Sequence, residues 1–177
     1  MPSARGDLAW LPLAEHLDAV AEPVAAAAAL VPRAEVARID PDLADTAQFC
    51  AAYDVAPEAS ANCVVVQGRR AERVVQAAVL VLAVDRADIN GVVRRHLDVR
   101  KISFLAAEAA QELTGMLQGG ITPVGLPADW VILVDAAVVA AGPVVIGAGV
   151  RDAKLLLDGA DLARLPGAQI LELALVR

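Results

Sequence analysis

The residues best suited to chemistry lie in one glycine-rich run between Gly119 and Arg151, which reads GGITPVGLPADWVILVDAAVVAAGPVVIGAGVR. The run combines a Gly/Pro loop, an apolar strand that ends in Asp135, and a second glycine turn. Glycine lets backbone N–H groups approach a ligand without an intervening Cβ, and proline fixes the loop around them. For any single Gly-x-Gly, a simple tight turn is the favoured interpretation. The whole run together predicts a loop that holds a small ligand.

Further landmarks occur in a defined order over residues 35–175. They are Thr46–Ala47 at a helix start, the Ala61–Val66 strand, Asp88 before a helix, Leu113–Gly115, the Gly119–Gly125 loop, Val134–Asp135 and Gly147–Arg151. With this order and spacing the chain resembles the YbaK/EbsC family, free-standing relatives of the editing domain inserted in bacterial prolyl-tRNA synthetases. The resemblance implies a trans-acting aminoacyl-tRNA deacylase for a small amino acid, which would hydrolyse the ester between a wrongly attached amino acid and the terminal ribose.

This reaction demands no strong nucleophile. The ester is already activated, so a site helps mainly by holding the carbonyl, placing a water and offering backbone N–H groups where negative charge develops. The resemblance implies catalytic roles for Asn62, Gly119, Gly120 and Thr122. It implies substrate-binding roles for Thr46, Pro123, Gly125, Asp135, Gly147, Gly149 and Arg151. No cofactor and no metal is expected.

One position departs from the family pattern. The family's strand carries a lysine followed by Thr or Ser, whereas this chain has Asn62 and Cys63 there. A charged hydrogen bond contributes about 1.5–3 kcal/mol, so losing such a lysine weakens binding roughly 10- to 150-fold. Arg151 or the Arg69–Arg70 turn could supply the missing charge. The alternative function is a binding module of the same fold, which recognises an aminoacyl or nucleotide end without hydrolysing it.

Other candidate residues each have two interpretations. Cys63 is a possible nucleophile, but a packing thiol is favoured because no histidine is placed to activate it. Asp135 either binds the substrate's ammonium group or caps the turn that follows it. His16 and His96 lie far apart without metal-ligand spacing, which favours surface or structural roles.

The charge composition of the chain limits the kinds of partner that it can bind. The net charge is −7, and a protein that coats nucleic acid needs many Lys and Arg contacts to phosphates, so no DNA partner is expected. We expect contact with the acceptor end of an aminoacyl-tRNA, for which a few arginines suffice. Arg94, Arg95 and Arg100 are candidates, although a solvated helix face is the default interpretation. An aminoacyl-tRNA synthetase is the second candidate partner, on which the chain would dock as an assembly protein.

The chain also lacks the sequence features of a membrane or secreted protein. Its apolar stretches are shorter than the roughly 20 residues that span a bilayer, and Asp7 and Glu15 interrupt the pattern of a signal peptide. We therefore expect no membrane partner and a cytoplasmic location. Cys50 and Cys63 are expected to be buried, reduced thiols.

The apolar pattern predicts a mixed α/β (α+β) single domain, in which a curled, mostly antiparallel mixed sheet is surrounded by helices. Residues 1–34 are expected to form a helical extension packed on the domain, with helix over 7–31 and Pro23 in the first turn of its second part. Residues 35–177 would form the editing-like domain. Predicted strands are Val36–Ile39, Ala61–Gln67, Arg73–Val84, Lys101–Phe104, Val131–Val134, Val144–Ile146, Leu155–Leu157 and Gln169–Leu173. Predicted helices follow Asp45 or Thr46, follow Asp88, cover Glu108–Thr114, and follow Asp158 or Asp161.

Overall fold

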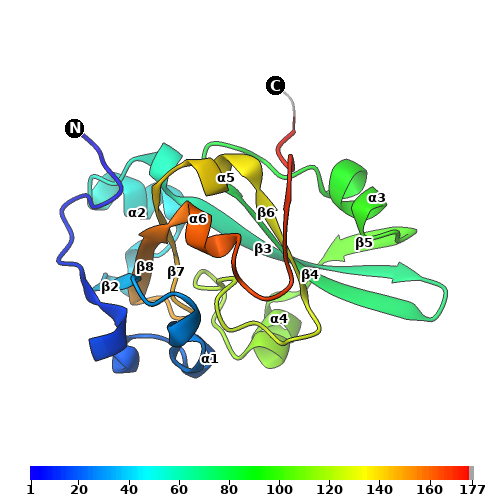
Figure 1. Cartoon of the computed structure of the whole chain (residues 1–177), viewed down its shortest axis with the longest axis horizontal. Helices are drawn as coiled ribbons and strands as arrows, with labels where there is room; N and C mark the ends of the chain where they lie inside the picture. Colours follow the sequence, from blue (N-terminus) through cyan, green and yellow to red (C-terminus); the bar gives the residue numbers. More distant parts are fainter. Residues whose placement is uncertain (176–177) are drawn as a thin grey trace.

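Two sheets form the centre of the molecule (Figure 1), in a computed structural model that describes residues 1–175. The first sheet has the order β1 (Leu11–Pro12), β2 (Glu35–Arg38), β8 (Ala153–Asp158) and β7 (Pro143–Gly147). The second has the order β5 (Lys101–Phe104), β3 (Ala61–Arg70), β4 (Arg73–Leu82), β6 (Val131–Asp135) and β9 (Ala168–Leu171). An isolated bridge between Ser60 and Val145 links the sheets. The predicted mixed α/β fold is confirmed, with its strands divided between two sheets.

Helices cover the sheets and their edges. They are α1 (Glu22–Ala26), α2 (Thr46–Ala52), α3 (Arg94–His96), α4 (Ala107–Thr114), α5 (Ala136–Ala140) and α6 (Gly159–Leu162). A π turn over Ile89–Val93 precedes α3, and 3-10 turns occupy Leu13–Glu15, Leu17–Ala19, Ala28–Leu30, Pro41–Leu43 and Pro57–Ala59. Predicted caps are confirmed at Asp88, which accepts hydrogen bonds from the N–H groups of Gly91 and Val92, and at Asp158, which accepts one from Ala160.

The β3–β4 hairpin is the longest element, and its outer half projects from the body beside β5 and α3 (Figure 1). It was predicted from two valine-rich runs around a polar turn, and the antiparallel register from Ala61↔Leu82 to Arg70↔Arg73 confirms it. Strand β4 is buried continuously over Ala77–Leu82 because β3 and β6 flank it and both of its faces are packed. β4 pairs with β6 in parallel, which makes the sheet mixed.

The predicted helix over residues 7–31 is wrong. The structure has β1, short 3-10 turns and the five-residue α1 in its place. Proline has no N–H to donate, and Pro12 instead ends the strand β1, which pairs with β2. Leu13 and Val24 are buried in the main core cluster, so tertiary packing replaced the apparent helical periodicity. The expected Pro23 at the first turn of a helix is confirmed in α1.

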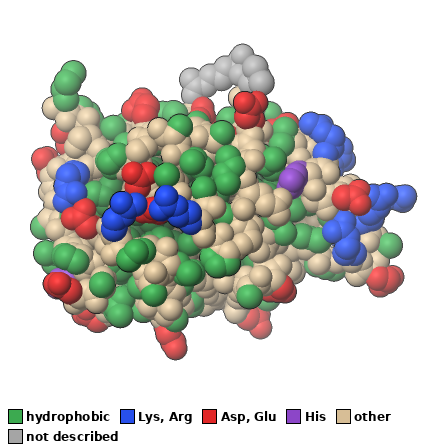
Figure 2. Space-filling view, in the orientation of Figure 1, with side chains coloured by type: hydrophobic (Ala, Val, Ile, Leu, Met, Phe, Trp, Pro, Cys, Tyr) green, Lys and Arg blue, Asp and Glu red, His purple; other side chains and the backbone are tan. Residues whose placement is uncertain are grey.

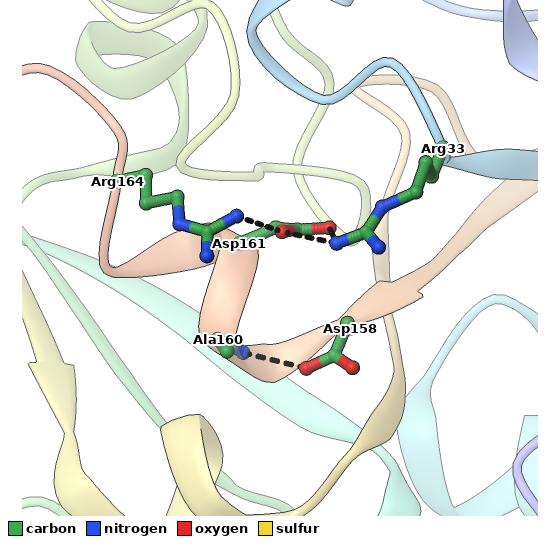
Figure 3. A network of polar contacts seen from close by, with 5 residues as sticks. All are labelled: Arg33, Asp158, Ala160, Asp161 and Arg164. Carbon is green, nitrogen blue, oxygen red and sulfur yellow. Dashed lines mark hydrogen bonds and ion pairs between the residues drawn. The ribbon is translucent and has the colours of Figure 1, made fainter.

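A polar network fastens this N-terminal segment to α6 (Figure 3). Asp161 is buried, and its carboxylate accepts hydrogen bonds from Arg33 at 2.9 Å and from Arg164 at 3.2 Å. Asp161 was one of two residues expected to cap α6. Asp158 is the cap, and Asp161 instead pairs with the two arginines.

Candidate functional site

A cavity of about 420 Å³ opens where the two sheets meet. Its walls come from the start of α2, the first half of β3, the end of β5, the start of α4, the loop on either side of Gly120, and the adjacent ends of β7 and β8. Its polar lining consists of Asp45, Thr46, Asn62, Cys63, Gln118 and Lys154, and the rest is aliphatic, apart from Gly119, Gly147 and Phe104. The cavity therefore joins a few polar groups to an apolar wall, the usual composition of a small-ligand site.

One wall is fixed by a hydrogen bond between two predicted site residues. Thr46 is the first residue of α2 and Asn62 is the second residue of β3, and the Thr46 hydroxyl donates to Asn62 Oδ1 at 2.5 Å. Both residues also border a second cavity of about 520 Å³ on the side of Cys50. Because the Asn62 oxygen accepts from Thr46, its amide nitrogen remains as a donor to a ligand.

Lys154 brings a positive charge to the same cavity. It lies on β8, is only 7% exposed, and donates from Nζ to the carbonyl oxygen of Ala44 at 2.9 Å. Its ammonium also stands over the ring of Phe49, 5.1 Å from the ring centre. Burial lowers the pKa of Lys154 from 10.5 to about 8, and nearby Cys50 and Asp45 oppose this shift only in part. The ammonium group is therefore still the main form at neutral pH.

Sequence reasoning missed Lys154 as a site residue. The signal was present, because a lysine interrupts an otherwise aliphatic segment, Ala153-Lys-Leu-Leu-Leu157, that was itself predicted to be a strand. Lysine is almost never buried without a partner or a function. Arg151 and the Arg69–Arg70 turn were the cations expected to replace the family's lysine. Neither Arg151 nor Arg69–Arg70 is among the residues that line this cavity.

The two glycine segments, separated by almost thirty residues in sequence, touch one another. A Cβ added to Gly147 would stand 2.4 Å from the carbonyl oxygen of Gly120, and Gly149 donates its N–H to the same oxygen at 2.6 Å. The N–H of Leu117 in turn donates to Gly149 at 2.9 Å. Glycine is required here because two backbones pack without space for side chains. Gly119 and Gly147 reach the cavity lining.

Other predicted site residues stand behind this lining. A Cβ on Gly120 would meet the backbone of Val150, and one on Gly125 would meet the backbone of Pro23. Gly149 packs on Val24 and Met116, and Pro123 is buried. Thr122 is fully buried, and its hydroxyl has no hydrogen-bond partner within the described residues. These residues shape the loop but do not line the cavity.

Arg151 connects the loop to the α2 side of the cavity. Its guanidinium donates to the carbonyl oxygens of Gln118 at 3.3 Å and Pro41 at 3.1 Å, and lies 3.9 Å from Asp45. A Cβ on Gly119 would stand 2.3 Å from the Arg151 Nη1. Arg151 therefore holds two walls of the cavity together from outside.

Asp135 is used as a cap, one of its two expected roles. Its carboxylate accepts from the N–H of Ala137 at the start of α5, and from Leu173 and Ala174 at 2.7 and 3.0 Å. It is buried and does not line the cavity. Its position therefore offers nothing to a substrate ammonium group in this cavity.

Cys63 lines the cavity but has the chemistry of a packing thiol. Burial raises the pKa of Cys63 to about 12, which keeps the thiol protonated at neutral pH. Burial also raises the pKa of Cys50, and both cysteines are free.

His16 and His96 lie outside the cavity lining. Within residues 1–175 no group of three or more metal-binding side chains is brought together, and no helix is long and apolar enough to cross a bilayer.

Comparison with known proteins finds a family model and several solved structures that are similar to this chain. A family model described as the aminoacyl-tRNA editing domain matches residues 40–165, which contain every lining residue of the cavity. A solved structure provisionally described as a trans-editing enzyme for prolyl tRNA synthetase is 20% identical, with a TM-score of 0.74 over 87% of this chain and 96% of that chain. No curated protein matches the chain.

Two further structures show how widely the fold is used. A scaffold protein from computational epitope grafting is 20% identical, with a TM-score of 0.75 over 88% of this chain and 97% of its own. A protein from Marinobacter aquaeolei VT8, provisionally described as acting in signal transduction, is 15% identical, with a TM-score of 0.55 over 94% of this chain and 31% of its own. At these identities the likeness shows the fold alone.

Proposed function

Since this chain belongs to the aminoacyl-tRNA editing domain family, we propose that it is a trans-acting deacylase, which hydrolyses the ester of a tRNA mischarged with a small amino acid. One observation carries this proposal. A buried ammonium group, Lys154, and the Thr46–Asn62 pair line the same cavity as Gly119 and Gly147. These groups surround a space of the size that a small ligand needs.

The reaction requires an electrophile held in place and a stabilised oxyanion. Water adds to the carbonyl carbon of the ester, and the bond from that carbon to the ribose oxygen breaks. One proton of the water passes to the ribose oxygen, which leaves as a hydroxyl, and the other passes to solvent as the amino-acid carboxylate forms. The ammonium of Lys154 stabilises the negative charge that develops on the carbonyl oxygen, since such a charge is most favoured next to a donor in a site that excludes water.

Backbone and amide groups complete the site. The N–H of Gly119 makes no hydrogen bond within the described residues, so it remains available to the same oxygen. The Asn62 amide nitrogen is available to a ribose or carbonyl oxygen of the substrate. Lys154 in this account supplies the cation that the family's strand lysine would supply, from β8 in place of β3.

Aliphatic side chains form the wall beside these polar groups. Ala44, Ala61, Ala107 and Ala110 contribute to this apolar wall. Such a wall suits an aliphatic substrate side chain, and one methylene changes discrimination by only about 1–3 kcal/mol.

The second candidate function is recognition of the aminoacyl end without hydrolysis. It is favoured by the composition of the lining. Of the described residues that line the cavity, Asp45 is the sole carboxylate and none is a histidine. The two functions differ in whether a bound ester is cleaved.

A panel of tRNAs charged with glycine, alanine, serine, cysteine and proline separates them. The deacylase function predicts release of at least one amino acid at a rate well above solution hydrolysis. Tight binding of a charged tRNA whose ester survives would establish the second function. Arg86→Met is the matched control for effects of lost charge, because Arg86 is exposed and does not line the cavity.

A further inference from the structure

Phe104 is an unusual side chain for this protein. The chain has five aromatic residues, and Trp10, Phe49 and Trp130 are at most 8% exposed. Tyr53 is half-buried and stacks near Phe49, with ring centres 5.5 Å apart. Phe104 is 62% exposed at the end of the edge strand β5, where it lines the mouth of the cavity. An aromatic ring so exposed contributes little to the core, which leaves one face for a ligand.

A basic groove lies immediately beside it. The groove has a volume of about 510 Å³, and its cations are Arg69, Arg94, Arg100 and Lys101. Within residues 1–175 none of these four forms an ion pair, whereas nearby Arg70 and Arg73 both pair with Asp98. Figure 2 shows basic side chains gathered around α3 and the outer part of the β3–β4 hairpin. Four unpaired cations in one groove contrast with a net charge of −7 for the whole chain.

Strand β5 connects the groove to the cavity. Lys101, Ile102 and Ser103 line the groove, and the next residue, Phe104, lines the cavity. Lys101 and Phe104 are separated by about 10 Å along an extended strand. Lys101 and Phe104 point to opposite faces of β5, because side chains alternate along a strand. β5 is an edge strand, so a single ligand can cross its free edge, with negative groups over the cations and a planar group on Phe104.

We propose that β5 is the docking track for the single-stranded 3′ end of an RNA, with the terminal base stacked on Phe104 and the preceding phosphates in the groove of Arg69, Arg94, Arg100 and Lys101. The identity of this RNA end rests on the proposed function, because the ester must enter the cavity next to Phe104. Stacking on an aromatic ring and a cationic groove along the backbone are the two devices by which single strands are bound.

Phe104 is tested by binding of a fluorescein-labelled RNA hairpin with an unpaired, uncharged 3′ end, measured by anisotropy. Removing one stacking ring weakens single-strand binding about 5- to 150-fold, so Phe104→Ala is expected to raise Kd by that factor. Phe104→Trp keeps a ring and is expected to bind as the wild type does. Equal Kd values for wild type and Phe104→Ala, with unchanged circular dichroism, would overturn the stacking role.

The groove is tested by the salt dependence of the same Kd. Each phosphate contact to a single strand contributes a slope of about 0.7 in log K against log salt, so Arg94→Gln with Arg100→Gln is expected to lower the slope by about 1.4. Arg33→Gln removes a charge from the Asp161 network (Figure 3) and is expected to leave the slope unchanged. If the slope falls equally in the Arg94→Gln/Arg100→Gln variant and in Arg33→Gln, the track is overturned and only an effect of net charge remains.

Hydrolysis measured on the same variants separates this inference from the function on which it rests. A wild type that cleaves charged tRNA, with Kd and KM insensitive to Phe104→Ala and to the arginine changes, overturns the track alone. Binding that depends on Phe104 and the groove in a protein that cleaves no charged tRNA supports the track and overturns the deacylase function.

Discussion

Lys154 on β8 donates a hydrogen bond of 2.9 Å to the carbonyl oxygen of Ala44, two residues before Thr46 at the start of α2. This contact fixes a buried ammonium group beside the Thr46–Asn62 pair and joins the first sheet to the helix across the cavity. Lys154 thus supplies the cavity with a cation that neither the Gly119–Gly125 loop nor the cavity-lining first half of β3 supplies.

The buried charge of Lys154 predicts a pH-dependent stability. Its folded pKa, about 8, lies below the ordinary 10.5, so the unfolded chain binds more protons between these values and stability contributed by this group rises with pH. The depression corresponds to about 3 kcal/mol. The unfolding free energy of wild type minus that of Lys154→Met should therefore rise by up to about 3 kcal/mol from pH 7.5 to 10.5 in urea titrations. Cys63, whose pKa is raised by burial, lowers the stability of both proteins as pH rises, and taking the difference between them removes this contribution. A difference in unfolding free energy that does not change with pH would contradict a buried ammonium.

The same pKa predicts the form of the pH–rate profile. If the ammonium stabilises the oxyanion, kcat/KM corrected for solution hydrolysis falls as pH rises through about 8. Arginine stays charged throughout this range, so the fall of kcat/KM near pH 8 should be absent in Lys154→Arg even if its rate is lower. If kcat/KM of Lys154→Arg falls at the same pH, a group other than Lys154 is responsible for the fall.

Moving the cation within the cavity is a sharper test of its role. Asn62 and Lys154 line the same cavity, so Asn62→Lys alone places two ammonium groups there and is expected to lower kcat/KM by like-charge repulsion. Asn62→Lys combined with Lys154→Met keeps one ammonium and should recover about 10-fold or more over Lys154→Met alone. Strictly additive losses would show that the two positions do not serve one substrate group.

The contact between the glycine segments predicts a structural cost at Gly147. A methyl group there would stand 2.4 and 2.8 Å from the carbonyl oxygens of Gly120 and Ile121, so Gly147→Ala must displace the loop and should cost more than about 2 kcal/mol. Gly142→Ala is the matched control. Gly142 has a φ of +72° but no atom within 4 Å of an added Cβ, so strain alone should cost about 1–2 kcal/mol. Equal unfolding midpoints for the two variants would remove the close-packing argument.

The unpartnered hydroxyl of Thr122 predicts a stabilising change. A buried donor without an acceptor costs about 1–3 kcal/mol, so Thr122→Val, which keeps the shape, should raise the unfolding free energy by about 1 kcal/mol. Because Thr122 is fully buried behind the lining, hydrolysis should stay within about twofold of wild type. If Thr122→Val loses most of the activity without losing stability, Thr122 has a direct role in the site after all.

The sequence predicted elements well where local signals were strong. The β3–β4 hairpin follows from two β-branched runs around Gly68–Ala71, and the Asp88 and Asp158 caps follow from side chains that bond nearby N–H groups. The helix over 7–31 failed because Leu13 and Val24 pack into a core formed by distant strands, which no local window contains.

The site was predicted less completely for the same reason. The convergence of the loop at Gly119 with the turn at Gly147 was expected, since the glycines mark close backbone approach. The sequence did not show which of these glycines face the cavity, because this depends on which backbone segment packs against each of them in the fold. Lys154 was missed because its place beside Ala44 depends on the pairing of β8 with β2 and β7, which spacing along the chain does not give.

The most direct measurement is single-turnover hydrolysis at pH 7 of the charged-tRNA panel by wild type, Lys154→Met and the exposed control Arg86→Met, which lies outside both the cavity and the basic groove. Wild type and Arg86→Met are expected to cleave at least one ester, and Lys154→Met is expected to cleave it at least about 100-fold more slowly, the loss expected when an oxyanion donor is removed. Cleavage by Lys154→Met at the wild-type rate, with its fold confirmed by circular dichroism, would contradict the central role of Lys154. Survival of every ester in the presence of wild type would contradict the deacylase function itself.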